Sequence, residues 1–371
     1  YGFWYDSISG YGAYFYDDNG DLVNPAQYIQ ASDGYRKTSH ELRIASPREN
    51  RVRFVGGLFW QQQEHDIHQR YRIDGLASDL SVTGYEDTIW LTEQEREDRD
   101  SAVFGEVSFD VTDKLALTAG GRWFRAENSL KGYFGFANGY SSQSDRLPEN
   151  RYGEAGCLAQ YGANWTSFKG APCKVFDKGV RENGSLGRFN ATYEISDSKM
   201  VYATWSEGYR PGGINRYGLL PPYKSDFLTN YELGWKTSWG GNKLTFNGAL
   251  FREDWKDFQF SYLGQFGLTE IRNANQARIN GLELDLSWAA SYNLQITGGF
   301  AWYDAKLTDD YCRETGADGE PLQVCFGPLV SGTTPDRALK GTRLPVTPKF
   351  KGSLNARYTF ELAGGEAHWQ A

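Results

Sequence analysis

Along much of the chain, apolar and polar residues alternate one by one. In residues 114–124, Leu115, Leu117 and Trp123 fall on one side of the alternation, while Thr118 and Arg122 fall on the other. The same split recurs in residues 103–111, 282–288, 294–303 and 349–360. Because successive side chains of a strand point to opposite faces, this pattern predicts β-strands with one apolar and one polar face.

Tryptophans stand at a fixed distance from the turns. Trp60, Trp123 and Trp302 each lie nine residues beyond a short polar turn, at positions 51, 114 and 293. About 9–11 residues let a tilted strand cross a bilayer, and aromatic rings favour the membrane surface. The pattern therefore predicts an all-β fold, a transmembrane antiparallel up-and-down β-barrel, with these three rings and Trp239 and Trp288 in its aromatic girdles.

The connections alternate between short and long. Short turns fall near residues 48–50, 112–114, 196–198, 240–242, 290–293 and 363–365, and long loops include residues 130–184 and 307–344. Outer-membrane barrels have short periplasmic turns and long extracellular loops, so six short turns imply about twelve strands. Residues 1–38 show no sustained alternation, and we expect them to form an extracellular loop. A water-soluble sandwich also alternates, but it has no reason to place every long loop at one end.

Composition is compatible with a barrel. Aromatic residues make up 16% of the 371 residues and mean hydropathy is -0.61, which fits a membrane barrel because only every second residue meets lipid. No stretch approaches the ~20 apolar residues of a transmembrane helix. The net charge of -8 argues against nucleic acid as a partner.

The four cysteines fall into two close pairs, Cys157 with Cys173 and Cys312 with Cys325. Each pair lies in a turn-rich segment, and disulfides persist in the periplasm and at cell surfaces, so we expect two disulfides. Four unrelated buried thiols are the alternative. A zinc site is disfavoured because no CxxC occurs and no histidine is nearby.

Six segments carry a family likeness. In chain order they read SHELRIAS (39–46), RFVGGLF (53–59), VYATWSEGYRPGGINR (201–216), NYELGWKTSWGGNKLTFNGALFREDWKDF (230–258), NANQARINGLELDLSW (273–288) and GTRLPVTPKFKGSLNARYTF (341–360). With these segments the chain resembles the barrel of TonB-dependent outer-membrane receptors of the iron-complex type. The resemblance implies a barrel of roughly 22 strands whose lumen is closed by an N-terminal plug.

The chain departs from that family pattern in its extent. It shows no plug, no energy-coupling box and no terminal aromatic strand, and it has about half the expected strands. We therefore interpret residues 1–371 as a central part of the barrel domain, with the plug and the last strands absent from this chain. Such a part alone would leave open sheet edges in lipid, so we expect a longer intact protein.

The resemblance also implies a function. We expect active uptake of a scarce ligand, most often a ferric siderophore or similar iron chelate, across the outer membrane of a Gram-negative bacterium. The implied partners are the inner-membrane TonB energy-coupling complex, reached through the plug, and outer-membrane lipid and lipopolysaccharide. No cofactor is implied. A passive porin and a secreted β-sheet carbohydrate-binding protein are the alternatives.

No enzyme motif is present: the chain contains no GxSxG, Walker loop, HExxH or CxxC. His65 and His68 would point to opposite faces of a strand, which disfavours a metal site. Glu283 and Asp285 share one strand face, and we expect them to line a polar lumen rather than to catalyse a reaction.

Ligand-binding candidates lie in the loops. Tyr209, Arg210, Asn215 and Arg216 belong to a segment that leaves a strand at Pro211, and its arginines could meet an anionic ligand. Salt bridges from this loop to the lumen wall are the alternative. Loop aromatics, represented by Tyr140 and Trp165, could stack on a ligand or pack against one another.

Overall fold

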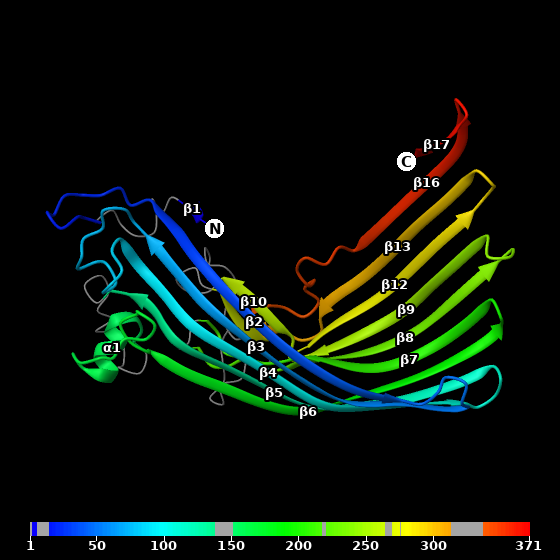
Figure 1. Ribbon diagram of the computed structural model, residues 1–371, viewed down its shortest axis with the longest axis horizontal. Coiled ribbons are helices and arrows are strands. Elements are labelled where there is room, and N and C mark those ends of the chain that lie inside the picture. Colours follow the sequence, from blue (N-terminus) through cyan, green and yellow to red (C-terminus); the bar gives the residue numbers. More distant parts are fainter. Residues whose placement is uncertain are drawn as a thin grey trace.

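The computed structural model describes residues 2–5, 15–137, 151–216, 220–263, 269–274, 276–312 and 337–371. Within these residues, thirteen antiparallel strands form one sheet, which is bent into an open trough (Figure 1). The strands of this sheet follow one another in chain order. Two short hairpins interrupt that order and form separate two-stranded sheets within long loops. The predicted all-β, up-and-down antiparallel order is therefore confirmed, with β1 as the thirteenth strand beside the twelve or so expected.

The sheet strands are β1 (Gly2–Tyr5), β2 (Gln27–Ala45), β3 (Val52–Arg72), β4 (Thr88–Asp110), β5 (Leu115–Phe136), β6 (Phe176–Ser196), β7 (Lys199–Arg210), β8 (Asp226–Trp239), β9 (Leu244–Lys256), β12 (Gln276–Ala289), β13 (Leu294–Leu307), β16 (Phe350–Leu362) and β17 (Gly365–Gln370). The two separate hairpins are β10 (Gln259–Leu263) with β11 (Thr269–Asn273), and β14 (Tyr311–Cys312) with β15 (Arg337–Ala338). The one helix in the described residues is α1 (Gly153–Tyr161). None of the described helical structure is long and apolar enough to cross a membrane.

Short and long connections lie at opposite ends of the trough, as expected. The hairpin turns from β2–β3 to β16–β17 lie at the right of Figure 1, and the long connections with α1 lie at the other end. One expectation about the loops is wrong. Residues 27–38 belong to β2, which pairs with β3 from Tyr28–Arg72 to Ala45–Val55. This part of β2 carries polar residues on both faces, so alternation could not reveal it.

The outer face of the trough is apolar. Leu58, Val103 and Trp123 are direct cross-strand neighbours on β3, β4 and β5, and their exposed fractions are 53%, 53% and 64%. Large exposed apolar patches mark membrane or protein contacts. A sandwich would have buried these side chains in a core, so the soluble alternative is disfavoured.

The five tryptophans predicted for the girdles differ in their positions along the strands. Trp60 and Trp123 are exposed within the long strands β3 and β5, nearer the short-turn ends than the loop ends, whereas Trp239 and Trp288 are exposed beside the short turns. Trp302 is half-buried and pairs with Phe350 of β16. No observation locates a bilayer, so their role in a girdle stays a prediction.

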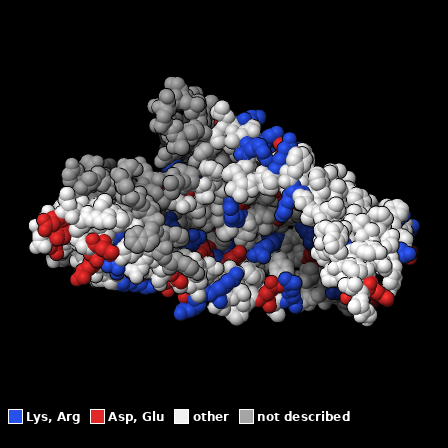
Figure 2. All heavy atoms as spheres, turned by 90° about the horizontal axis from the view of Figure 1, so that it is seen from above, with Lys and Arg blue, Asp and Glu red and all other residues white. Residues whose placement is uncertain are grey.

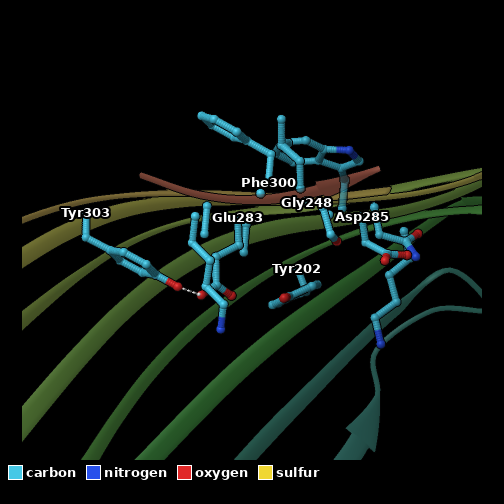
Figure 3. Close-up of a pocket in the computed structure, with 16 residues that line it drawn as sticks. Tyr202, Gly248, Glu283, Asp285, Phe300 and Tyr303 are labelled. Atoms are coloured by element: carbon cyan, nitrogen blue, oxygen red, sulfur yellow. Dashed lines mark hydrogen bonds between the residues drawn. The ribbon is translucent and has the colours of Figure 1, made fainter. Parts of the chain in front are cut away.

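The inner face of the trough is polar. Looking into the hollow, Figure 2 shows Lys and Arg side chains together with Asp and Glu. Arg188 of β6 pairs with Glu106 of β4 at 3.1 Å. Further along the sheet, Tyr303 donates a 2.6 Å hydrogen bond to Glu283, and Figure 3 shows both on the opposite side of the strands from Phe300. This arrangement agrees with the predicted polar lining.

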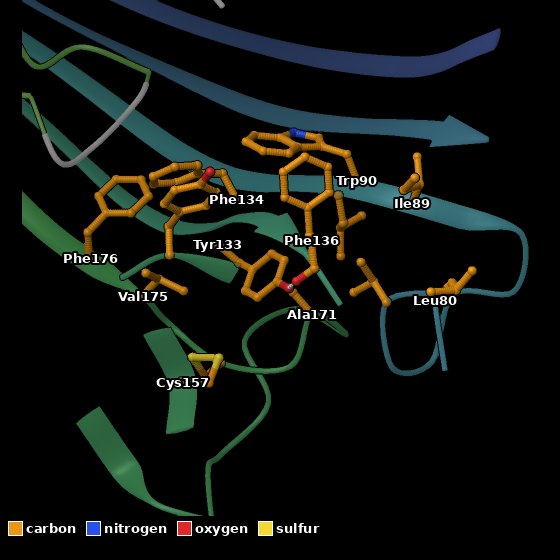
Figure 4. Packing of buried hydrophobic residues seen from close by; sticks show 14 of the residues in the cluster. Leu80, Ile89, Trp90, Tyr133, Phe134, Phe136, Cys157, Ala171, Val175 and Phe176 are labelled. Carbon is orange, nitrogen blue, oxygen red and sulfur yellow. Dashed lines mark hydrogen bonds between the residues drawn. A yellow bond between two sulfur atoms is a disulfide. The ribbon is translucent and has the colours of Figure 1, made fainter. Parts of the chain in front are cut away.

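A compact aromatic core lies among the long loops. Trp90 meets Phe136 edge to face at 4.8 Å, and Phe134 stacks on Tyr152 at 5.5 Å (Figure 4). The predicted disulfide Cys157–Cys173 is present and is buried beside this core. Residues 151–175, in the connection between β5 and β6, are thus fixed to the ends of β4 and β5.

The second cysteine pair reaches beyond the described part of the chain. Cys312 is buried at the end of β14, whereas Cys325 lies outside the described residues. Cys312 is disulfide-bonded, as predicted, and the structure of its predicted partner Cys325 is not described.

Candidate functional site

Between β7 and β8, residues 211–216 and 220–225 form a loop that folds onto the inner wall at the loop end of the trough. Gly213 and Tyr223 exchange two backbone hydrogen bonds of 2.9 Å, which close the loop on itself. A Cβ atom at Gly213 would lie 2.6 Å from the Tyr223 hydroxyl, so a side chain there would have to displace the Tyr223 ring. Ile214 and Asn215 are buried in the contact with the wall.

Three polar side chains of the wall hold this loop, one from each of three adjacent strands. Gln94 of β4 donates to the Arg216 carbonyl at 2.9 Å, and Asn128 of β5 accepts from the Ile214 amide at 2.8 Å. Glu182 of β6 accepts from the amides of Gly212 at 3.1 Å and Ser225 at 2.9 Å. Buried backbone groups need such partners, so these side chains fix the path of the loop.

The hairpin β10–β11 packs against the same loop. Asn215 accepts from the Ile271 amide at 2.7 Å and donates to the Ile271 carbonyl at 3.0 Å. Gln259 donates to the carbonyls of Pro211 at 2.9 Å and Lys224 at 3.0 Å. The buried amide of Asn215, a predicted ligand group, is therefore engaged in joining two loops.

Arg210 and Tyr209 are engaged in the wall as well. Arg210 donates to buried Asp226 at 2.6 Å, and its guanidinium lies 5.5 Å from the Trp255 ring. Tyr209 stacks on Phe124 at 3.6 Å and donates to Asp100 at 3.0 Å. These contacts match the alternative in which the loop is tied to the lumen wall.

Arg216 differs from the other candidates. Its carbonyl is held by Gln94, but its side chain is exposed and makes no hydrogen bond or salt bridge with the residues that the structure describes. Asp33 of β2 acts on it electrostatically and favours its charged form. A fixed backbone with an available guanidinium can receive an anionic group that enters the trough.

The two aromatic candidates have different outcomes. Trp165 is partly buried against the aromatic core of Figure 4, which matches the alternative that loop rings pack together. Tyr140 lies outside the described residues. The histidines considered as metal ligands, His65 and His68, have different partners. A ring nitrogen of His65 lies 3.1 Å from Asp33, and one of His68 lies 2.6 Å from Glu93.

Sequence reasoning missed the residues that position the loop: Gln94, Asn128, Glu182, Asp226 and Gln259. Period-two alternation places the first three on the inner face of their strands. The alternation does not indicate that Gln94 contacts a loop more than a hundred residues away in the sequence.

Comparison with known proteins supports one family. The family model described as TonB dependent receptor-like, beta-barrel matches residues 1–371. The pesticin receptor of Yersinia enterocolitica is 26% identical in an alignment of 332 residues that covers 86% of this chain and 38% of that protein. The chain thus spans about two fifths of the length of this curated relative.

Two solved structures show the same fold. The ferric yersiniabactin uptake receptor FyuA from Yersinia pestis superposes with a TM-score of 0.63 at 17% identity, covering 92% of this chain and 42% of that one. The copper transporter OprC superposes with a TM-score of 0.56 at 16% identity, covering 92% and 44%. Together with the match of the family model over its whole length, the trough and its loops identify this chain as a member of the TonB-dependent receptor-like β-barrel family, whose proteins lie in the Gram-negative outer membrane.

Proposed function

We propose that this chain forms part of the wall and mouth of an importer that takes up a scarce metal chelate across the outer membrane. A ferric siderophore is the leading ligand class. The family supports receptor-mediated uptake, and its relatives carry the names pesticin receptor, ferric yersiniabactin uptake receptor and copper transporter. No covalent chemistry is part of this proposal.

The remaining parts of the proposal concern the intact protein. The chain spans 38% of the pesticin receptor and 42% of FyuA. We propose that the rest of the full-length protein supplies further strands and a plug, through which the inner-membrane TonB complex drives import. Outer-membrane lipid and lipopolysaccharide would surround the wall.

The observation that carries the proposal is the exposed Arg216 on a loop fixed to the inner wall. A porin needs an open lumen, whereas here residues 211–216 and 220–225 and the paired strands β10 and β11 fold inward at the loop end of the trough. Ferric chelates that carry carboxylate or other anionic oxygens would find an available guanidinium there.

Binding of a panel of ferric chelates to the full-length protein in detergent tests this role. For a chelate with exposed anionic groups, Arg216→Gln should weaken binding by roughly 10- to 150-fold, because a hydrogen bond to a charged group contributes about 1.5–3 kcal/mol. Arg188→Gln is the matched control, since Arg188 also faces the inner side but pairs with Glu106. Equal affinities for wild type and Arg216→Gln would contradict the assignment.

A further inference from the structure

An apolar pocket lies at the loop end of β13, where the two separate hairpins meet. It has a volume of about 220 Å³, and most of its wall consists of the aromatic and aliphatic side chains of Phe258, Phe260, Leu307, Tyr311, Leu344 and Pro345. An engineered apolar cavity of about 150 Å³ in another protein stays free of water and binds benzene. This pocket is therefore large enough for one six-membered ring or a short alkyl chain.

The floor of the pocket belongs to the inner face of the sheet. Leu307 follows Tyr303 by four residues on β13, so both side chains share a face, and Figure 3 shows Tyr303 on the side of the strands opposite Phe300. Leu307 is buried, whereas Thr342 and Pro345 at the rim are exposed. The pocket thus combines a buried floor with a rim that solvent reaches from the hollow of the trough.

The walls are fixed by contacts within the protein. Trp255 of β9 meets Phe258 edge to face at 4.6 Å. Phe260 lies between Phe258 and Tyr311, with ring centroids 6.5 and 5.8 Å away. Backbone hydrogen bonds of 2.9 and 3.1 Å hold the segment after β15 along the end of β13. A largely pre-formed apolar pocket of this kind is typical of a small-molecule site.

One hairpin connects the pocket to the loop that carries Arg216. Phe260 of β10 lines the pocket, and the next residue, Ser261, pairs with Ile271 of β11. Ile271 exchanges two hydrogen bonds with Asn215, the residue before Arg216. Neighbouring strands lie ~5 Å apart, so on the order of 10 Å separates the backbone at Arg216 from the wall of the pocket. One chelate can therefore contact both.

The chemistry of the pocket selects an uncharged group. Ala274, Leu307 and Leu344 are buried in its floor, which carries no charged side chain among the residues that the structure describes. At the rim, Arg343 donates a 3.0 Å hydrogen bond to the Thr347 carbonyl. A charged group would lose its hydration in this floor without gaining a partner, whereas an apolar group is stabilised by leaving water.

We infer that the pocket is a second ligand subsite, which takes an uncharged hydrocarbon group carried by the imported chelate. That group is an aromatic ring or a short alkyl chain, and it would lie between Phe260 and Leu344 while Arg216 contacts the anionic side of the same chelate. The inference rests on the proposed uptake of a metal chelate and adds that the preferred chelate is amphiphilic.

Binding of two small fluorinated probes to the full-length protein in detergent, followed by fluorine NMR, tests the pocket directly. Para-fluorobenzyl alcohol carries a ring, omega-fluorohexanol carries an alkyl chain, and neither is charged. At least one should bind saturably. Ala338→Phe, which fills the pocket, should weaken that binding roughly 10- to 150-fold, the factor that corresponds to burial of one phenylalanine side chain. Ala163→Phe makes the same change at an exposed loop position and should leave probe binding unchanged.

The two probes also decide which apolar group the pocket prefers. Saturable binding of neither probe, or equal binding to wild type and Ala338→Phe, would overturn the pocket. If Ala338→Phe does not fold, Pro345→Trp takes its place, because this exposed position closes the rim without filling the buried floor.

A competition experiment connects the pocket to the imported chelate. A ferric chelate that the protein binds should displace the probe, and Arg216→Gln should weaken binding of that chelate while it leaves probe binding unchanged. A chelate that binds without displacing the probe would overturn the subsite. If no ferric chelate binds although the probe does, the proposed uptake is refuted and the pocket remains a binding site.

Discussion

Asp226 joins the strands on either side of the inward loop to the hairpin that packs against it. It lies at the start of β8 with 1% of its surface exposed. Its carboxylate accepts hydrogen bonds from the Arg210 guanidinium at 2.6 and 3.2 Å and from the backbone amide of Gln259 at 3.0 Å. One side chain thus joins β7, β8 and the hairpin β10–β11. Asp226→Ala removes all three bonds without touching the candidate ligand group, Arg216.

The cost of Asp226→Ala follows from what each partner loses. The Arg210 side chain is 48% exposed, so water replaces part of its lost interaction, and the pair contributes at most about 1 kcal/mol. The Gln259 amide stays buried without an acceptor, which costs about 1–3 kcal/mol. We expect the local opening free energy of the loop to fall by about 2–3 kcal/mol.

Amide hydrogen exchange followed by mass spectrometry measures this opening directly. In Asp226→Ala, amides of residues 212–225 and 259 should exchange roughly 30- to 150-fold faster, since 1.4 kcal/mol is a factor of ten. Asp226→Asn keeps one oxygen acceptor for the Gln259 amide and should show a smaller increase. Asp177→Ala, which breaks an exposed pair with Lys174, should leave these amides unchanged. Exchange in Asp226→Ala within about twofold of wild type would refute the reasoning.

Three further changes have expected outcomes. Replacing Cys157 and Cys173 with serine opens a loop of sequence separation 16, so residues 151–175 should lose about 3 kcal/mol of local stability and become protease-sensitive, whereas unchanged digestion would contradict this. Tyr209→Phe keeps the stack on Phe124 but loses the bond to Asp100, and the midpoint of thermal unfolding should fall by an amount equivalent to about 1 kcal/mol. Gly213→Val should displace the Tyr223 ring, so that the loop amides exchange faster, as in Asp226→Ala. Amide protection equal to that of wild type would contradict this and show that the Tyr223 ring can move aside without opening the loop.

The wall could be predicted from the sequence because its physical cause is local. A strand with lipid on one side and water on the other must alternate between apolar and polar residues. The common face of Leu115, Leu117 and Trp123 can therefore be recognised without knowing which strands pair with theirs. Where both faces meet water, as in residues 27–38, the signal disappears and the strand was missed. Polar turns and their spacing located the ends of the trough for the same local reason.

The site could be predicted only in part. The segment with Pro211 and its glycines was recognised as a loop with arginines, but its inward fold depends on Gln94, Asn128 and Glu182, which lie on strands distant in sequence. Likewise, the pairing of β9 with β12 sets the hairpin β10–β11 aside, and no local pattern reports it. Side chains that are ordinary on their own strands acquire a role only through the tertiary fold.

The central claim is that this wall belongs to an energised importer, and uptake of a labelled ferric chelate by cells that carry the full-length protein tests it most directly. The chelate should be one that the purified protein binds, and uptake should be compared in otherwise identical cells with and without TonB. We predict uptake that requires both this protein and TonB. Uptake at the same rate in cells without TonB would contradict the claim and indicate a passive porin.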